Sequence, residues 1–464
     1  MSTLVVTGGL VAAEYGTFRA DIVVRDGRIA ALVDDSSGIE GERFDVSGAV
    51  VFPGGVDIHT HLREPSRIVR EGFDYGTASA AAGGITTVVE MPQADPLVQD
   101  VDSFRTKLKA ASKASLLDFG LYAAATGQSE DELEALLREG ALAFKAFMCA
   151  SSPGYPRLDD AGLLDCLRAV QRLDSMLIVH AENNELLQAG LARMADEGRT
   201  DPLAHADSRP PVVETTAIAT VVRLAEEAGA RLHVAHVSTA EGASTVASAR
   251  ARGAQVTCET CPQYLLMDLD DLVRLGPWAR CAPAIRSRAE VEALWPLVLD
   301  GTIGAIASDH SPYTYEDKEQ GRDDIFKATL GLNVIQVMLP GVFDEGVERR
   351  GLSYTRFAEL SAAGPARIVG LYPRKGSITI GADADLAIWD PDARWDIRRD
   401  ELLSRFPWTP LEGRTLRGRV TATIRRGEFV YRDGAICAEP GSGVFLRGDA
   451  QMSEPGLHQA IGGR

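Results

Sequence analysis

The chain has 464 residues and a formal net charge of −18, because 66 Asp and Glu outnumber 48 Lys and Arg. Hydrophobic residues make up 45% of the sequence and charged residues 25%, an average composition that excludes a disordered chain or one embedded in a membrane. The acidic balance also disfavours nucleic acids and anionic membranes as main partners, since both are polyanions.

The first 50 residues contain short apolar runs separated by turns, including an Asp26-Gly27 hairpin signal. Runs of the same kind return near the C-terminus. The strand-like runs are 4–6, 21–24, 29–33, 376–380, 384–389 and 420–424. We predict that residues 1–52 and 373–448 contribute to one small β-sandwich, and that the polar tail 449–464 is mobile.

The middle of the chain repeats an apolar run, a polar or Gly/Pro turn, and a helix-like stretch such as 130–138 or 214–228. The eight apolar runs are 49–53 leading to Asp57, 84–91, 116–124, 141–148, 175–180, 231–236, 255–261 and 303–308. Strands that alternate with helices indicate a parallel sheet, so residues 53–372 predict an α/β protein with a (β/α)8 TIM barrel. A doubly wound open sheet is the alternative, but no Gly-x-Gly-x-x-Gly follows an early strand.

Histidines stand at the ends of three of these runs, where the chemistry of such a barrel gathers. His59 and His61 follow the first run at a spacing of two, which lets both imidazoles reach one metal ion. His180 ends the fifth run. In the sixth run, His233 and His236 differ by an odd spacing and should face opposite ways, so we predict that His236 is a ligand and that His233 is structural.

Two further residues complete the predicted metal site. Lys145 lies inside the fourth apolar run, where burial would lower its pKa and favour a neutral amine that can capture carbon dioxide as a carbamate. An edge lysine that reaches solvent is the alternative. Asp309 follows the eighth run, and its carboxylate could bind a metal and exchange protons with water.

The motifs that surround these residues resemble those of the cyclic amidohydrolases, the group of allantoinase, hydantoinase, dihydropyrimidinase and dihydroorotase. The matching segments are 53–65, 81–87, 91–92, 144–145, 180–183, 236–238, 258–264 and 308–312. The resemblance covers residues 3 to about 445.

The resemblance implies a binuclear zinc site, although other divalent metals are possible. His59, His61 and Asp309 would bind one ion, and His180 and His236 the other, with N6-carboxylated Lys145 as the bridge. Asp309 would act as catalytic base and then as acid while water opens the ring. The resemblance also implies a homo-oligomer, commonly a tetramer, that acts on a small cyclic amide.

The ring that is opened is less clearly indicated. Segments 71–77, 258–262 and 308–312 look closer to allantoinases, whereas 148–154, 262–265 and 316–319 look closer to L-selective hydantoinases. Opening of allantoin is our prediction, and opening of hydantoins or dihydropyrimidines is the alternative.

The substrate contacts predicted from the sequence are Arg63, Gln93 and Ala282. Arg63 looks like the dihydroorotase arginine that clamps a substrate carboxylate, although an ion pair with Glu64 or Glu71 is the alternative. Gln93 stands where dihydroorotases usually have Asn, which makes that activity less favoured.

Other features mark the remaining alternatives. A scaffold protein that has lost its metal is disfavoured because all six ligand types are present, and a mononuclear deaminase would need no bridging lysine. The charged stretch 316–324 is predicted to be a solvated loop near the rim, with a lid as the alternative. Few cysteines, no secretory signal and no run of about 18 apolar residues together predict a cytoplasmic protein.

Overall fold

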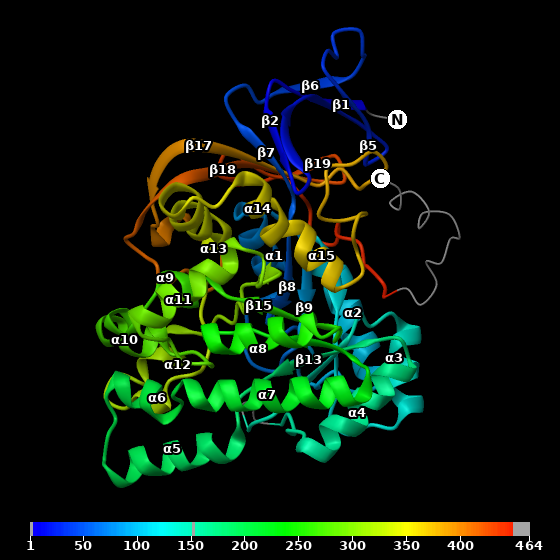
Figure 1. Ribbon diagram of the computed structural model, residues 1–464. Coiled ribbons are helices and arrows are strands. Elements are labelled where there is room, and N and C mark those ends of the chain that lie inside the picture. The colour runs from blue at the N-terminus through cyan, green and yellow to red at the C-terminus, as the bar shows by residue number, and fades with distance from the viewer. Residues whose placement is uncertain (1–2, 151–153, 449–464) are drawn as a thin grey trace.

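The computed structural model describes residues 3–150 and 154–448. Its larger part is a barrel of parallel strands surrounded by helices, and its smaller part is a pair of β-sheets, drawn at the top of Figure 1. Strands from both ends of the chain pair in one of these two sheets. The predicted mobile tail, 449–464, lies outside the described residues.

The barrel strands follow one another in chain order, and each pairs in parallel with the next. A parallel bridge between Thr60 and His310 joins the two ends of the series. The strands are β8 (Gly55–Thr60), β9 (Ile85–Glu90), β10 (Asp118–Leu121) continued by β11 (Ala123–Ala124), β12 (Phe144–Phe147), β13 (Met176–His180), β14 (Arg231–Val234), β15 (Val256–Thr260) and β16 (Ala305–Ile306). The predicted (β/α)8 barrel is confirmed.

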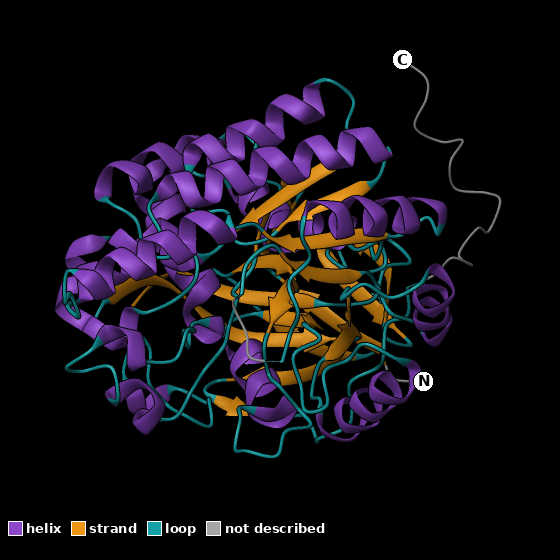
Figure 2. Ribbon diagram, turned by 90° about the horizontal axis from the view of Figure 1, so that it is seen from below, coloured by secondary structure: helices purple, strands orange, loops and turns teal. Residues whose placement is uncertain are grey.

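Helices cover the outside of the barrel and surround the strands in Figure 2. Those that connect successive strands include α1 (Gly72–Ala82), α2 (Val101–Ala114), α3 (Glu130–Glu139), α4 (Asp160–Arg172), α5 (Asn184–Asp196), α6 (Pro202–Ser208), α7 (Pro211–Ala228), α8 (Ala240–Ala251), α9 (Pro262–Leu266), α10 (Leu269–Leu275) and α11 (Arg288–Leu299). The helices after the last barrel strand are α12 (Tyr315–Glu319), α13 (Ile335–Val342), α14 (Tyr354–Ala358) and α15 (Gly364–Ile368). No helix in the described part of the chain is long and apolar enough to cross a membrane.

Local sequence signals set the helix ends. The Ser129 hydroxyl and the Glu132 side chain form a reciprocal capping box at the start of α3, and Gly140 ends the helix in a left-handed conformation with a φ of 109°. The predicted helical segments 130–138 and 214–228 correspond to α3 and α7.

The β-sandwich combines strands from both ends of the chain. One sheet has the order β5 (Arg28–Val33), β4 (Asp21–Arg25), β1 (Thr3–Thr7), β6 (Glu42–Asp45). The other has the order β20 (Ala435–Ile436), β19 (Glu428–Arg432), β18 (Thr415–Arg425), β17 (Leu386–Asp396), β7 (Val50–Pro53), β2 (Leu10–Ala13), β3 (Gly16–Arg19). A common core of aliphatic side chains such as Val6, Ile22 and Ile388 joins the two sheets.

The first predicted barrel run is corrected by these pairings. Residues 49–53 contain β7, which pairs with β17 and β2 of the sandwich, and the first barrel strand is β8, which begins at Gly55. The run is apolar throughout and has no period that could separate two consecutive strands.

The C-terminal segment also departs from the expected boundary of the sandwich at residue 448. The last sandwich strand, β20, ends at Ile436, and the chain then reaches the barrel. Phe445 forms a parallel bridge with Phe119 of β10, and the Leu446 N–H donates to the Phe119 carbonyl at 2.7 Å. Residues near 445 therefore extend the barrel wall.

A buried charged cluster connects the barrel to the sandwich. Lys375 is fully buried, and its Nζ lies 2.5 Å from Asp118 Oδ2, 2.8 Å from Asp385 Oδ2 and 3.0 Å from Asp383 Oδ2. Asp118 begins β10, while Asp385 directly precedes β17 of the sandwich. The cluster therefore fixes the position of one part against the other through charge-assisted hydrogen bonds.

Candidate metal centre

One cavity of about 340 Å³ collects the polar residues at the ends of the barrel strands. Its lining includes every residue that the sequence predicts as a metal ligand: His59, His61, Lys145, His180, His236 and Asp309. The predicted substrate contacts Arg63, Gln93 and Ala282 line the same cavity. The fold thus brings together residues that are up to 250 positions apart in the chain.

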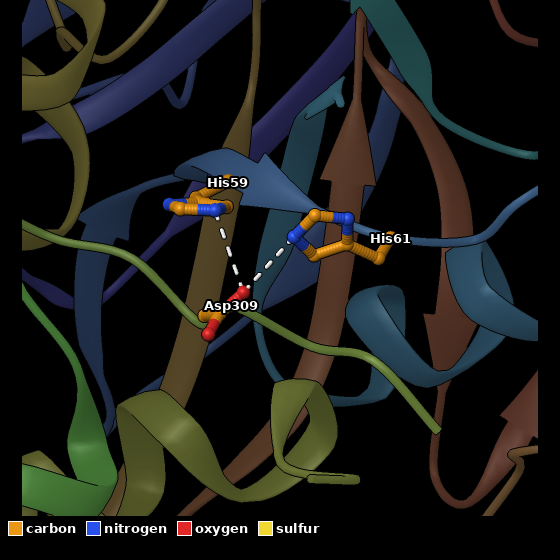
Figure 3. A group of neighbouring side chains, drawn as sticks. All are labelled: His59, His61 and Asp309. Atoms are coloured by element: carbon orange, nitrogen blue, oxygen red, sulfur yellow. Dashed lines mark ion pairs between the residues drawn. The ribbon is translucent and has the colours of Figure 1, made fainter. Parts of the chain in front are cut away.

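His59, His61 and Asp309 form the first cluster, shown in Figure 3. Asp309 Oδ1 lies 3.0 Å from His61 Nε2 and 3.4 Å from His59 Nε2. The two imidazoles come from the end of β8, and the carboxylate comes from the loop after β16. Three donor atoms that face one point in this way form a metal-binding cluster.

His180 and His236 form a second group beside the first. His180 Nδ1 lies 2.9 Å from His236 Nε2, and the ring centroids of His59 and His236 are 5.3 Å apart. His180 ends β13, and His236 lies two residues beyond β14. The four imidazoles therefore surround one space and can divide between two ions.

Lys145 on β12 lines the same cavity as these two groups, and its side chain is fully buried. Its Nζ has no hydrogen-bond partner among the described residues. Burial lowers the pKa of the Lys145 amine to about 8, because the nearby carboxylates of Glu259 and Asp309 offset only part of the desolvation. The predicted alternative, an edge lysine that reaches solvent, is wrong.

Burial also determines the charge state of the other ligands. It lowers the pKa of His59, His61 and His236, so the neutral imidazoles that a metal requires are favoured. It raises the pKa of the Asp309 carboxyl, which nearby His59 and Lys145 oppose. The proposed imidazole ligands are thus buried and rich in lone pairs.

Backbone strain is concentrated at the same place. Arg63, His236 and Asp309 have φ values of 59°, 40° and 48°, in the left-handed region that residues other than glycine rarely occupy. Strained backbone persists where the surrounding structure enforces it, and functional sites are where it clusters.

Buried carboxylates behind the ligands are a feature that the sequence analysis missed. Glu182 accepts a hydrogen bond from His180 Nε2 at 2.8 Å, and Arg209 Nη1 lies 3.0 Å from the same oxygen of Glu182. Burial alone would raise the pKa of Glu182, but Arg209 and His180 lower it to about 2. Glu90 accepts from Lys107 Nζ at 3.0 Å.

The regular alternation of side chains expected for His233 and His236 does not extend to His236. Strand β14 ends at Val234, and the left-handed backbone of His236 breaks the alternation of side chains. His233 Nε2 lies 3.2 Å from Glu259 Oε2, and the backbone N–H of His236 donates to Glu259 Oε1 at 3.3 Å, while the His236 side chain lines the cavity.

Arg63 forms the wall beside the first cluster. Its Nη2 donates to Ser311 Oγ at 2.7 Å, and its guanidinium lies 4.5 Å from the centre of the Tyr313 ring. No ion pair of Arg63 with Glu64 or Glu71 occurs among the described residues. Arg63 Nε and Gln93 Oε1 are both buried without a hydrogen-bond partner there, so this wall offers a free donor and a free acceptor.

The charged stretch 316–324 is only partly the solvated loop that was expected. Lys318 of α12 is fully buried and donates to the carbonyl oxygens of Arg280 and Thr329, at 3.1 and 3.0 Å. Because Arg280 and Thr329 line the cavity, this lysine holds two of its walls together.

The donor set fits divalent metal ions of the zinc class. Imidazole nitrogens and a carboxylate are the ligands that such ions prefer. The Nδ1 atoms of His61 and His236 and the Nζ atom of Lys145 are buried without hydrogen-bond partners among the described residues, which is a costly state for polar atoms.

Comparisons with known proteins agree with this geometry. A family model described as "Amidohydrolase family" matches residues 50–430. An allantoinase of Rubrobacter xylanophilus is 42% identical and aligns over 97% of this chain and 99% of its own length. An L-hydantoinase of Paenarthrobacter aurescens is 35% identical, over 96% and 98%. The solved structure of an L-hydantoinase (dihydropyrimidinase) from Arthrobacter aurescens superposes with a TM-score of 0.94, at 35% identity, over 96% of this chain and all of that one.

Proposed function

The chain belongs to the amidohydrolase family, and from this premise we propose that it opens the ring of allantoin to give allantoate. The protein is a hydrolase that acts on cyclic amides. Relatives named allantoinase at 35–42% identity over nearly the full length favour this ring. The structural observation that carries the proposal is that the six predicted metal ligands share one cavity with the polar side chains of Arg63 and Gln93.

The metal ligands in this proposal are the six residues of the cluster. His59, His61 and Asp309 would hold one zinc ion, His180 and His236 a second, and Lys145 would bridge them as its N6-carboxylated form. When bound, the two ions supply Lewis acidity that activates water and polarises a carbonyl group.

Asp309 carries the proton in the proposed reaction. Water adds its oxygen to a ring carbonyl carbon, and the Asp309 carboxylate accepts the proton that the water loses. The ring C–N bond then breaks, and the Asp309 carboxyl gives the same proton to the departing nitrogen. Burial of Asp309 raises its pKa, which makes the carboxyl a better base than an exposed aspartate.

The polar wall supports allantoin over hydantoins with hydrocarbon substituents. A ureido group carries both a carbonyl acceptor and N–H donors, whereas an alkyl group carries neither. Arg63 Nε is a free buried donor and Gln93 Oε1 a free buried acceptor, so the pair can meet both halves of a ureido group. Ala282 lines the same cavity and would contact the ring.

Hydantoin opening is the second candidate. The observation that favours it is the close superposition on an L-hydantoinase structure. Apolar lining from Phe147, Ala328 and Leu330 would suit a hydrocarbon substituent.

A substrate panel with zinc-reconstituted protein separates these candidates. We expect kcat/KM for allantoin to exceed the values for 5-substituted hydantoins, dihydrouracil and dihydroorotate. A higher kcat/KM for a 5-alkyl hydantoin would assign the second candidate instead. The cytoplasmic location and the homo-oligomer stay predictions, and light scattering on the purified protein would test the oligomer.

A further inference from the structure

Glu90, Glu182 and Glu259 are buried glutamates close to the ligand cluster, and their charges are balanced differently. Glu90 is paired with Lys107 and Glu182 with Arg209, both at 3.0 Å. Glu259 forms ion-pair contacts only with His59 and His233, and with no lysine or arginine among the described residues. Its side chain is 1% exposed, so water does not balance its charge either.

Glu259 is also the point at which several segments of the site meet. One carboxylate oxygen contacts His59 Nδ1 and accepts the His236 N–H. The other lies 3.2 Å from His233 Nε2. His233 is in turn held by Thr257, whose hydroxyl lies 2.8 Å from His233 Nδ1. His233 and Thr257 are cross-strand partners of β14 and β15, so the strand register enforces this contact.

The contact between Glu259 and His59 selects the tautomer of the His59 imidazole. When Nδ1–H donates a hydrogen bond to the carboxylate, the lone pair of the neutral ring is on Nε2. This is the nitrogen that faces Asp309 at 3.4 Å. The neighbouring His61 has no such partner on Nδ1 within the described residues. Of the two histidines on the first ion, only His59 is therefore oriented in advance.

We propose that Glu259, held by His233 and Thr257, is a positioning residue that orients His59 and balances the charge of the metal pair. This inference rests on the metal site of the proposed function. A buried carboxylate without a cation is unfavourable, and carboxylation of Lys145 would remove the amine charge from the site. Divalent ions bound to His59 and His236 would supply the missing positive charge.

The test compares Glu259→Gln with Glu214→Gln in the full chain. Glu214 is an equally buried glutamate that pairs with Arg286 at 3.1 Å and contacts no predicted ligand. Zinc affinity is measured by competition with a chromophoric chelator. We expect Glu259→Gln to weaken zinc binding by about 10- to 100-fold, the range for outer partners of metal-bound histidine, and Glu214→Gln to leave it unchanged.

Thermal melts of the zinc-free proteins test the charge argument separately. Zinc-free Glu259→Gln should melt no lower than zinc-free wild type, because the substitution removes an unbalanced charge. Zinc-free Glu214→Gln should melt lower, because it leaves Arg286 without its partner. A lower melting temperature for Glu259→Gln alone would overturn the charge-balancing role.

Thr257→Val provides a milder variant that leaves the Glu259 carboxylate in place. Loss of one hydrogen bond in the chain of contacts should weaken zinc binding by about 2- to 10-fold, and the visible spectrum of the Co²⁺-loaded protein should shift. Unchanged affinity and spectrum in Thr257→Val, or equal affinity losses in Glu259→Gln and Glu214→Gln, would contradict the proposal. A wild type that binds zinc but leaves allantoin intact would refute the proposed function alone.

Discussion

Among the fully buried lysines, Lys145 at the rim of the barrel and Lys375 at the junction with the sandwich lie in opposite environments. Lys375 is surrounded by Asp118, Asp383 and Asp385. Burial alone would lower its pKa, but the three aspartates raise it. Lys145 has no hydrogen-bond partner in the described chain, and burial lowers its pKa to about 8.

The difference shows that burial of a lysine does not by itself indicate function. At the junction, positive and negative groups are matched, so the polar atoms serve to hold two parts of the fold together. At the rim, the amine and several imidazole nitrogens are unmatched. A buried polar atom without a hydrogen-bond partner calls for an explanation, and a bound ligand that contacts this atom is one.

Lys145→Ala tests most strongly whether the two lysines have different roles. We expect the variant to lose most of its zinc and at least about 100-fold in kcat/KM, the upper end of the loss for groups that only support a metal ligand. Small carboxylates added to the buffer should restore part of the activity. Zinc content and turnover equal to wild type would show that the amine carries no bridging group.

Lys375→Met should give the converse result. Removal of the cation leaves three carboxylates buried together, and breaking a buried ion pair costs about 3–5 kcal/mol. Urea unfolding should show this loss, while zinc content and kcat/KM of the folded protein stay near wild type. A variant of normal stability would mean that the junction cluster does not hold the two parts together.

Arg63→Leu tests a cation that lines the cavity but does not belong to the proposed metal ligands. We expect a fall in kcat/KM of about 2- to 10-fold for neutral allantoin, the worth of one ordinary hydrogen bond. Anionic dihydroorotate should lose about 10- to 100-fold, because hydrogen bonds between charged groups are stronger. Equal losses for both substrates would remove the proposed contact with Arg63.

The smallest expected effect is the pH dependence of the junction. Because the folded pKa of Lys375 is raised, its contribution to stability is complete below the unfolded pKa of about 10.4 and is lost as pH rises above it. The gap in unfolding free energy between wild type and Lys375→Met should therefore stay constant up to about pH 10 and narrow as the pH rises further, through the raised pKa of folded Lys375. A constant gap would place the stabilisation elsewhere.

The sequence could predict that the proposed ligands gather at one cavity because of one general property of barrels. Parallel strands end at the same rim, so His59, His180 and Asp309, each near the end of an apolar run, were expected to meet, and all three line the cavity. Lys145 was predicted for a similar reason, since a charge within an apolar strand must be buried or bound.

Other features could not be predicted because they depend on contacts between distant residues. Glu259 and His59 are 200 positions apart, and Arg209 reaches Glu182 from the loop after α6. Glu259 did carry a signal, since it is a charge within the apolar run 255–261. The placement of His236 depends on its own left-handed backbone, which no side-chain pattern encodes.

The central claim is that two metal ions share a carboxylated Lys145, and a crystal structure of the zinc-loaded protein tests it most directly. We expect two anomalous peaks at the zinc edge, one beside His59, His61 and Asp309 and one beside His180 and His236, with branched density beyond Lys145 Nζ. A single peak next to an unmodified lysine amine would contradict the account.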